Sequence, residues 1–400
     1  MKNPLCFSRN VSTAMLSTNA WLKAAFIFGL PLALIACGGG GTSTTGGNTS
    51  AASAPDAPAS GTASSTTPSA PQHILFVGDS FTHGRYTPVR NYNAGGTQNA
   101  PAASPLVVDE NFGQTGLRAE SSEEAGPWGG IPGIFAELVA EAHLNYDVHI
   151  EAISETSLEK NFFAASSVIE QTKWNSVVLQ ELSAKPLPQT LTGSSTSDPA
   201  GFCSSVKTIE QGVHSVAPSA GVYLYEPWPT ADLAQQLSGT PGTTEYHNRY
   251  INNLSVLGNA NHNAYYSAAS HDGAIVSVAP VGEAWQRAWA EGVANPDPKV
   301  SSALPLLWYN INAVNNPALK ANNPDLHHPS IYGAYLSALV LFEQITGTDV
   351  RAFGRAEAAA QEFGIPAAIA VQLQGVAWET VAQESAIPLD ESVDPCTLKQ

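Results

Sequence analysis

The chain has 400 residues, of which 43% are hydrophobic and 13% are charged, a composition typical of a globular protein with a substantial core. Its 34 acidic and 17 basic residues give a formal net charge of -17. We therefore expect no nucleic-acid partner, because phosphate binding needs clustered Lys and Arg.

The first 36 residues have the pattern of a signal peptide. Basic residues precede the apolar run "AAFIFGLPLALIA", which is short for a transmembrane helix, and Cys37 follows directly. The stretch "LIAC" (residues 34–37) resembles a bacterial lipobox, which implies a signal peptide over residues 1–36 and a lipid anchor on Cys37. By that resemblance we expect a protein of the bacterial cell envelope, held at the membrane, and at the outer membrane because Gly38 follows the cysteine. The alternative is an ordinary secretion signal that contains a cysteine.

Residues 37–70 consist mostly of Gly, Ser, Thr, Ala and Pro, which cannot bury a core, and predict a flexible linker. If Cys37 carries lipid, Cys203 and Cys396 are the only possible pair in the mature chain. The sequence leaves open whether they lie close enough to form a disulfide.

From His73 onward, short apolar runs alternate with amphipathic stretches. Strands are predicted at 73–78, 146–153, 176–182, 221–227 and 274–282, and helices near 131–144, 157–172, 203–216, 244–259, 282–292 and 330–346. Repeated strand–helix units predict an α/β fold, a three-layer α/β/α sandwich around a five-stranded parallel sheet. We expect a layout similar to that of flavodoxin. We assign this domain to residues 71–350 and a helical extension packed on it to residues 351–400. The polar segments 85–128 and 184–202 do not fit the repeat, and such long loops are often functional.

Ser80 directly follows the first predicted strand, in "HILFVGDSFTHG". In parallel sheets, sites lie at the carboxyl ends of the strands. A serine becomes a nucleophile only when a base takes its proton and a third group orients that base. Asp325 and His328, in "NPDLHHPS", are three residues apart, so that their side chains can meet within one loop. The alternatives are that Ser80 lies in a surface turn and that the second segment is only a helix-capping loop.

The two motifs resemble a known superfamily. "GDSFTHG" resembles the first sequence block of the SGNH/GDSL hydrolases, and "DLHHP" resembles their last block, the Asp-x-x-His pair. The stretches "SLEKNF", "WNSVVLQELS", "VAPVGEAW" and "HHPSIYGAYLSALVLFEQITG" are similar to a divergent branch, the DUF4886-type proteins. The resemblance covers the chain from about His73 to Thr348. It implies an SGNH-type serine ester hydrolase that uses an acyl-enzyme and needs no cofactor or metal. Ser80 would be the nucleophile, His328 the general base and then acid, and Asp325 the residue that orients His328.

The resemblance also implies an oxyanion hole, where this chain departs from the superfamily pattern. The Ser80 N–H is one expected donor. The superfamily adds a glycine N–H, but "AISETSLEK" has Ser154 and Glu155 at that place, and a left-handed backbone would strain Glu155. Where the superfamily has an asparagine, Gln180 keeps an amide donor one methylene further out. We expect the hole to comprise Ser80, Glu155 and Gln180; alternatively, Gln180 only satisfies loop backbone groups.

The substrate follows only from the resemblance, which favours O-acyl groups, typically acetyl, on a small or polymeric carbohydrate. A lipid or polyester esterase is the enzymatic alternative. The altered oxyanion residues motivate an alternative of another class, a non-catalytic glycan-binding surface lipoprotein on the same scaffold. Trp228, in "EPWP", is either a wall for a sugar or acyl group or a packing residue. The spacing of His262, His271 and His327 matches no compact zinc motif, so we expect no metal.

Overall fold

A computed structural model of the chain describes residues 70–97, 105–309, 325–384, 388–390 and 392–398. The predicted signal peptide, Cys37 and nearly all of the predicted linker lie outside these residues. Among the described helices, none is both long and apolar enough to cross a membrane.

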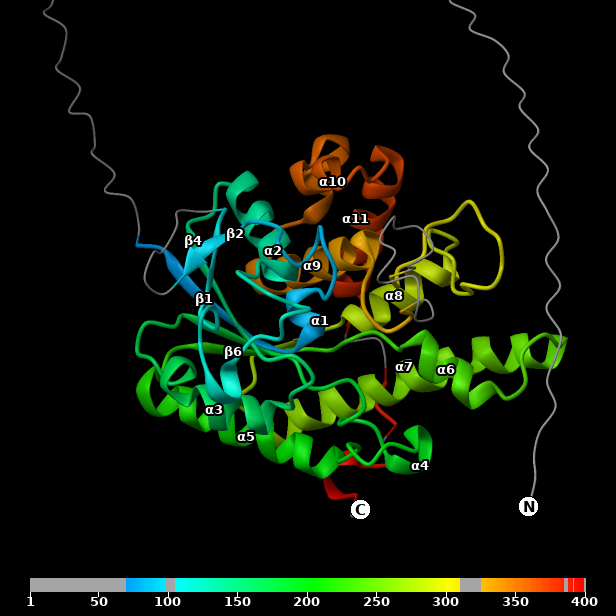
Figure 1. Cartoon of the computed structure of the whole chain (residues 1–400), viewed down its shortest axis with the longest axis horizontal. Helices are drawn as coiled ribbons and strands as arrows, with labels where there is room; N and C mark the ends of the chain where they lie inside the picture. The colour runs from blue at the N-terminus through cyan, green and yellow to red at the C-terminus, as the bar shows by residue number, and fades with distance from the viewer. Residues whose placement is uncertain (1–69, 98–104, 310–324, 385–387, 391, 399–400) are drawn as a thin grey trace, which may run out of the picture. The chain divides into compact units, whose positions relative to one another are not determined.

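The described residues form one sheet of seven parallel strands in the order β2-β3-β4-β1-β5-β6-β7 (Figure 1). The strands are β1 (Gln72–Gly78), β2 (Ala94–Thr97), β3 (Val107–Asp109), β4 (Tyr146–Ala152), β5 (Ser176–Leu179), β6 (Gly221–Tyr225) and β7 (Ser277–Ala279). The five strands that the sequence predicts are β4-β1-β5-β6-β7, and this order is the flavodoxin-like 2-1-3-4-5.

The predicted number of five strands is wrong, because β2 and β3 extend the sheet by two short strands. Both come from the polar segment 85–128, where a pair of glycines and the shortness of the strands leave no apolar alternation to detect. Two predicted strands are also too long. β5 ends at Leu179 because the next side chain, Gln180, bonds to the loop at Ser80. β7 begins only at Ser277 because the preceding helix continues to its cap at Gly273.

Helices cover both faces of the sheet (Figure 1). On one face lie α2 (Gly130–Glu141), α8 (Val281–Ala290) and α9 (Ile331–Thr346), and α10 (Ala358–Glu362) and α11 (Ala367–Ala382) pack on this layer. On the other face lie α3 (Leu158–Ile169), α5 (Pro199–Val216) and the second half of α7 (Thr244–Asp272). Shorter helices are α1 (Ser80–His83), α4 (Gln189–Thr192) and α6 (Ala231–Ser238), with 3₁₀ turns at Gly116–Arg118, Val350–Ala352, Gly354–Ala356 and Pro395–Thr397.

The central strand β1 explains why the core has two halves. Side chains alternate along a strand, so Ile74 and Phe76 join the cluster on one face, and Leu75 and Val77 join the cluster on the other. A strand that is covered on both faces needs apolar residues at every position, which is the continuous run that the sequence shows. The predicted three-layer α/β/α class is confirmed.

The two cysteines whose pairing the sequence leaves open are joined. Cys203 lies in α5, and Cys396 lies in the 3₁₀ turn Pro395–Thr397. They form a disulfide with a Cα–Cα distance of 5.5 Å. The bond ties the last described segment to the helical layer that contains α5.

Candidate active site

Ser80 is the first residue of α1, directly beyond the carboxyl end of β1. The abrupt end of the strand has a steric cause. A Cβ on Gly78 would lie 2.2 Å from Oγ1 of Thr82 and 2.5 Å from Oε1 of Gln180, so only glycine fits between β1 and the loop that follows. Gly78 therefore allows the chain to turn tightly after β1, which places Ser80 at the carboxyl end of the strand.

Asp79 holds this turn. Its Oδ1 accepts the N–H of Phe81 at 2.9 Å, and it caps α1. Burial raises the pKa of Asp79 to about 6. Among the described residues, no hydrogen bond joins the Asp79 carboxylate to His328. Asp79 therefore supports the position of Ser80 through the backbone of the turn.

Ser80, His328 and Asp325 form one continuous chain of hydrogen bonds. Oγ of Ser80 lies 2.8 Å from Nε2 of His328, and Nδ1 of His328 lies 2.8 Å from Oδ2 of Asp325. Ser80 and His328 are both 5% exposed, so these bonds are shielded from bulk water. The geometry is that of a nucleophile, its base and the acid that orients the base.

The electrostatics of the three groups fit these roles. Burial alone would raise the pKa of Asp325, but the hydrogen bond and the charge of His328 lower it, so that Asp325 is a carboxylate. Burial, with the nearby charges of His327 and Arg85, lowers the pKa of His328 although Asp325 raises it, and the net lowering favours the neutral imidazole near pH 7. Nδ1–H then donates to Asp325, and the lone pair of Nε2 faces the Ser80 hydroxyl.

Further donors hold the Asp325 carboxylate in place. The N–H groups of His327 and His328 donate to Oδ1 at 2.9 and 3.1 Å, and the hydroxyl of Tyr86 donates to Oδ2 at 2.6 Å. The Tyr86 ring stacks on Tyr309 at 3.7 Å. Sequence reasoning missed Tyr86, because it lies in the polar segment 85–128 and no local spacing relates it to Asp325.

The helix-capping interpretation of "NPDLHHPS" is also correct. Oγ of Ser330 accepts the N–H groups of Tyr332 and Gly333 at the start of α9. A capped helix start fixes the loop that carries Asp325 and His328, so the two interpretations support each other.

The expected oxyanion donors differ in how they are placed. Within the described residues, the Ser80 N–H has no hydrogen-bond acceptor, so it can donate to an oxyanion. Glu155 is exposed and has a φ of 57°, the left-handed conformation that favours the glycine of the superfamily pattern. Oγ of the neighbouring Ser154 lies 2.9 Å from Nε2 of His83, so a hydrogen bond joins the turn to α1. No contact between Glu155 and Ser80 is seen, and its role stays a prediction.

Gln180 is used by the nucleophile loop. Its Oε1 accepts the N–H of Asp79 at 3.0 Å and the hydroxyl of Thr82 at 2.8 Å, and its Nε2 donates to the carbonyl of Glu181 at 2.6 Å. The alternative interpretation, that Gln180 satisfies loop groups, therefore describes its contacts. The Gln180 side chain also hydrogen-bonds to the Asp79 carboxylate, and its role in an oxyanion hole stays a prediction.

Trp228 is a packing residue. Its ring is stacked between Phe81 at 4.6 Å and Trp285 at 4.4 Å, and its Nε1 donates to the carbonyl of His327 at 2.9 Å. Both faces of the ring are covered by these contacts, and Trp228 also borders the cavity beside His327. It supports Phe81, the residue after Ser80, and the loop of His328.

A small cavity of about 290 Å³ lies beside the triad loop and is bordered by His327. Nδ1 of His327 lies 3.1 Å from Oδ2 of Asp232, and its Nε2 lies 3.2 Å from Oγ of Ser183. Burial lowers the pKa of His327, but Asp232 raises it by more, and the net pKa is raised. The lining offers several hydrogen-bonding groups, including Ser183, Thr230, Asp232, Gln236 and Asn261.

A larger cavity of about 750 Å³ borders the other side of the triad loop, at Tyr86, Tyr309 and Pro329. Much of its lining is apolar, with Val89, Val300, Leu304, Leu306, Ile331 and Phe363. Both cavities combine polar and apolar lining residues, and neither lining includes Ser80 or His328.

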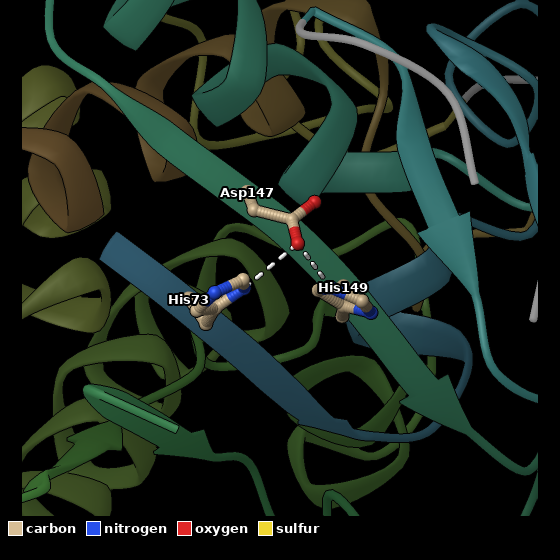
Figure 2. A group of neighbouring side chains, drawn as sticks. All are labelled: His73, Asp147 and His149. Atoms are coloured by element: carbon tan, nitrogen blue, oxygen red, sulfur yellow. Dashed lines mark hydrogen bonds and ion pairs between the residues drawn. The ribbon is translucent and has the colours of Figure 1, made fainter. Parts of the chain in front are cut away.

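Three groups of side chains with potential metal ligands occur in the described part of the chain, and none includes Ser80, Asp325 or His328. In one of them, the sulfur of Cys396 is already bound in the disulfide. His262 and His271 each belong to one group, whereas His327 belongs to none. The groups are His73–Asp147–His149 (Figure 2), His271–Asp394–Cys396 and Glu226–His262–Glu283.

No family model matches the sequence, and no curated protein matches it either. Among solved structures, the chain is similar to a putative GDSL-like lipase from Parabacteroides merdae, with 13% identity over 70% of this chain and 96% of that one and a TM-score of 0.39. It is also similar to a phospholipase A1 from Streptomyces albidoflavus, with 14% identity, 68% and 98% coverage and a TM-score of 0.36. It is similar as well to an acetyl xylan esterase, with 11% identity over 68% of this chain and 99% of that one and a TM-score of 0.38. At these TM-scores the similarities decide neither family nor activity, and both are inferred from the residues of this chain.

Proposed function

We propose that the protein is a serine ester hydrolase of the SGNH/GDSL superfamily, in its DUF4886-type branch. The observation that carries the proposal is the hydrogen-bonded chain Ser80–His328–Asp325, with 2.8 Å at each step. A serine in an ordinary surface turn is not expected to hydrogen-bond to a neutral histidine whose other nitrogen donates to a carboxylate. A non-catalytic scaffold would not need this arrangement.

The geometry defines a mechanism. His328 takes the proton from the Ser80 hydroxyl as Oγ attacks the ester carbonyl, and Asp325 stabilises the imidazolium that forms. The Ser80 N–H stabilises the negative oxygen, assisted by Glu155 N–H and Gln180 in the predicted hole. His328 then gives its proton to the leaving alcohol, which leaves an acyl group on Ser80. Water, activated by His328, releases the acid and restores the serine.

The direct test is labelling of the full chain with a fluorophosphonate probe and localisation of the adduct by mass spectrometry. We expect one adduct per chain, on Ser80, with no adduct in Ser80→Ala. In His328→Ala the labelling rate should fall about 10³-fold or more, because the serine loses its base. If wild-type protein with a normal circular-dichroism spectrum gives no adduct, the glycan-binding scaffold becomes the better account.

For the substrate we propose O-acetyl groups on carbohydrate. The support is the cavity of about 290 Å³ beside His327, whose lining includes hydroxyl, amide and carboxylate groups that can bond to sugar hydroxyls. The apolar cavity beside Tyr86 favours a second candidate, esters of longer acyl chains. The two are separated by kcat/KM on acetylated xylo-oligosaccharides and on p-nitrophenyl esters from acetate to dodecanoate.

Variants of the two cavities show which cavity binds the preferred substrate. If the substrate is acetylated carbohydrate, Asp232→Asn should raise KM for the oligosaccharide and leave p-nitrophenyl acetate turnover unchanged. If the substrate carries a long acyl chain, Leu304→Trp should reduce turnover of the dodecanoate alone, because the larger side chain fills the apolar cavity. A preference for dodecanoate over acetate would reject the carbohydrate proposal.

We also propose that Cys37 carries a lipid and that the protein acts in the bacterial cell envelope, at the outer membrane. The support is the "LIAC" stretch with the glycine-rich segment after it. In a bacterial host, the full chain should sediment with the outer membrane, and Cys37→Ser should not. Equal sedimentation of both forms would reject the anchor.

A further inference from the structure

His73, Asp147 and His149 lie close together near the amino ends of the neighbouring strands β1 and β4 (Figure 2). Nδ1 of His73 lies 2.8 Å, and Nε2 of His149 lies 3.0 Å, from the same oxygen, Oδ2 of Asp147. These ligand atoms all lie within 4.8 Å of one another. Two imidazole nitrogens and one carboxylate oxygen are a donor set that Zn²⁺ prefers.

The strand register brings the three side chains together. In the parallel pair β1–β4, His73 is opposite Asp147, and Leu75 is opposite His149. Asp147 and His149 are two residues apart on β4, so that they point to the same face of the sheet. The group lies toward the amino ends of the strands, whereas Ser80 lies beyond the carboxyl end of β1. It is therefore distinct from the candidate active site.

A second carboxylate orients His149. Its Nδ1 lies 2.7 Å from Oε1 of Glu110, which also accepts from Lys173 Nζ at 3.3 Å, and its ring lies edge-on to Trp174 at 4.9 Å. A histidine that binds a metal usually donates its other N–H to a carboxylate in this way. In the neutral form of His149, Glu110 favours the proton on Nδ1, so that the lone pair of Nε2 faces Asp147.

This orientation leaves two electron-rich atoms facing each other, Nε2 of His149 and Oδ2 of Asp147. They repel each other unless a proton or a metal cation lies between them. Ligand atoms on a tetrahedral Zn²⁺ are about 3.3 Å apart, from bonds of about 2.0–2.1 Å, so small side-chain shifts would admit the ion. The side chains of His73 and Asp147 are 31% and 29% exposed, which gives an ion a path in and leaves room for water as a further ligand.

We propose that His73 Nδ1, Asp147 Oδ2 and His149 Nε2 form a binding site for one divalent transition-metal ion, preferably Zn²⁺, with water as the fourth ligand. Because the ligands come from β1 and β4, the bound ion clamps the central strand of the sheet to its neighbour. The site is independent of the serine chemistry, and its occupancy stabilises the fold by mass action.

The test is a Zn²⁺ titration by isothermal calorimetry of the full chain, without an affinity tag and after dialysis against a chelator. We expect one ion per chain and a higher melting temperature with Zn²⁺. Asp147→Asn and His73→Ala should each weaken binding at least tenfold and abolish the melting shift. The matched control is His247→Gln, because His247 Nδ1 also lies 2.7 Å from a carboxylate, that of Asp297, but belongs to none of the metal-ligating groups in the described residues.

Cobalt(II) gives a second readout, since tetrahedral coordination produces a strong visible absorption that surface binding does not. His73 is partly exposed, so His73→Ala should keep its circular-dichroism spectrum even if Asp147→Asn does not. If the wild type binds no stoichiometric ion, or if His73→Ala binds as tightly as the control, the proposal is wrong and protons alone hold the group together.

Discussion

At the scale of single residues, the proposed reactivity of Ser80 depends on what its neighbours do to one proton. His328 accepts it only while the imidazole is neutral, and burial favours the neutral form. Asp325 acts in the opposite direction and also fixes the ring. The proposed activity therefore depends on a balance between desolvation and the charges of Asp325, His327 and Arg85.

The pH dependence of the proposed esterase follows from this balance. Because burial lowers the pKa of His328, kcat/KM should rise with pH to a plateau with its midpoint below 6.5, the ordinary histidine value. In Asp325→Asn the plateau should fall about 10³–10⁴-fold, and the midpoint should move lower still, since the raising charge is gone. Initial rates on p-nitrophenyl acetate between pH 4 and 9 provide the check. A wild-type midpoint above 6.5 would contradict this assignment.

Tyr86 is expected to be a positioning residue. Removal of its hydroxyl in Tyr86→Phe takes one charge-assisted donor from Asp325, which is worth about 1.5–3 kcal/mol when fully made. We expect kcat to fall about tenfold or more, with KM nearly unchanged and the pH midpoint shifted. Tyr309→Phe keeps the ring that stacks on Tyr86 and is the control. Equal kinetics of Tyr86→Phe and wild type would show that the backbone N–H groups suffice to hold Asp325.

At the scale of elements, the loops at the carboxyl edge of the sheet satisfy one another. Glu181, after β5, accepts the N–H of Leu158 at 3.0 Å and of Leu182 at 2.7 Å through the same oxygen. It thereby caps α3, whose own N-cap residue Ser157 makes no side-chain cap bond. Its other oxygen is buried and has no partner in the described residues. The Glu181 carboxylate therefore caps α3, but its burial leaves it poorly solvated.

Glu181 should make stability depend on pH. Burial raises its pKa from 4.5 to about 7, so the folded state holds this proton more tightly than the unfolded state. Its contribution is fully present below pH 4.5 and is lost as pH rises through about 7. Glu181→Gln keeps an acceptor for α3 and removes the charge. Relative to wild type, its free energy of unfolding should gain about 1–3 kcal/mol between pH 5 and pH 8.

Urea unfolding at both pH values measures this difference. The comparison cancels any loss from the altered hydrogen bonds, because that loss is common to both conditions. A difference that is independent of pH would show that Glu181 is ionised in the folded state at both values.

At the scale of the whole molecule, the two faces of the sheet are closed by segments far apart in the sequence. α10 and α11 pack on the layer of α2, α8 and α9, whereas the segment that contains Cys396 crosses to the layer of α5. Figure 1 shows the C-terminal end near α5. The disulfide therefore holds together parts of the chain that would separate on unfolding.

Loss of this disulfide should destabilise the protein. Cys203 and Cys396 are 193 residues apart, and closure of so long a loop is worth up to about 5 kcal/mol in the chain-entropy model. We expect the double variant Cys203→Ser/Cys396→Ser to lose about 2–5 kcal/mol of unfolding free energy in urea. Reduced wild type should match it, and a reductant should not affect the variant. A melting curve unchanged by the substitutions would contradict this expectation.

What the sequence by itself determines is local. The apolar run before Gly78 predicts a strand covered on both faces, and the spacing of Asp325 and His328 predicts a side-chain pair, because both patterns involve residues within one turn or strand. Repetition of such units also predicts a parallel sheet with helices on both faces, because crossovers between parallel strands are right-handed.

Tertiary structure alone decides which distant groups meet. Ser80 and His328 are 248 residues apart, and only the folded sheet brings them to 2.8 Å. The contacts of Tyr86, the use of Gln180 by the nucleophile loop, the two added strands and the convergence of His73 with β4 have the same cause. They depend on side chains approaching across strands and loops, and neither periodicity nor spacing along the chain records such an approach.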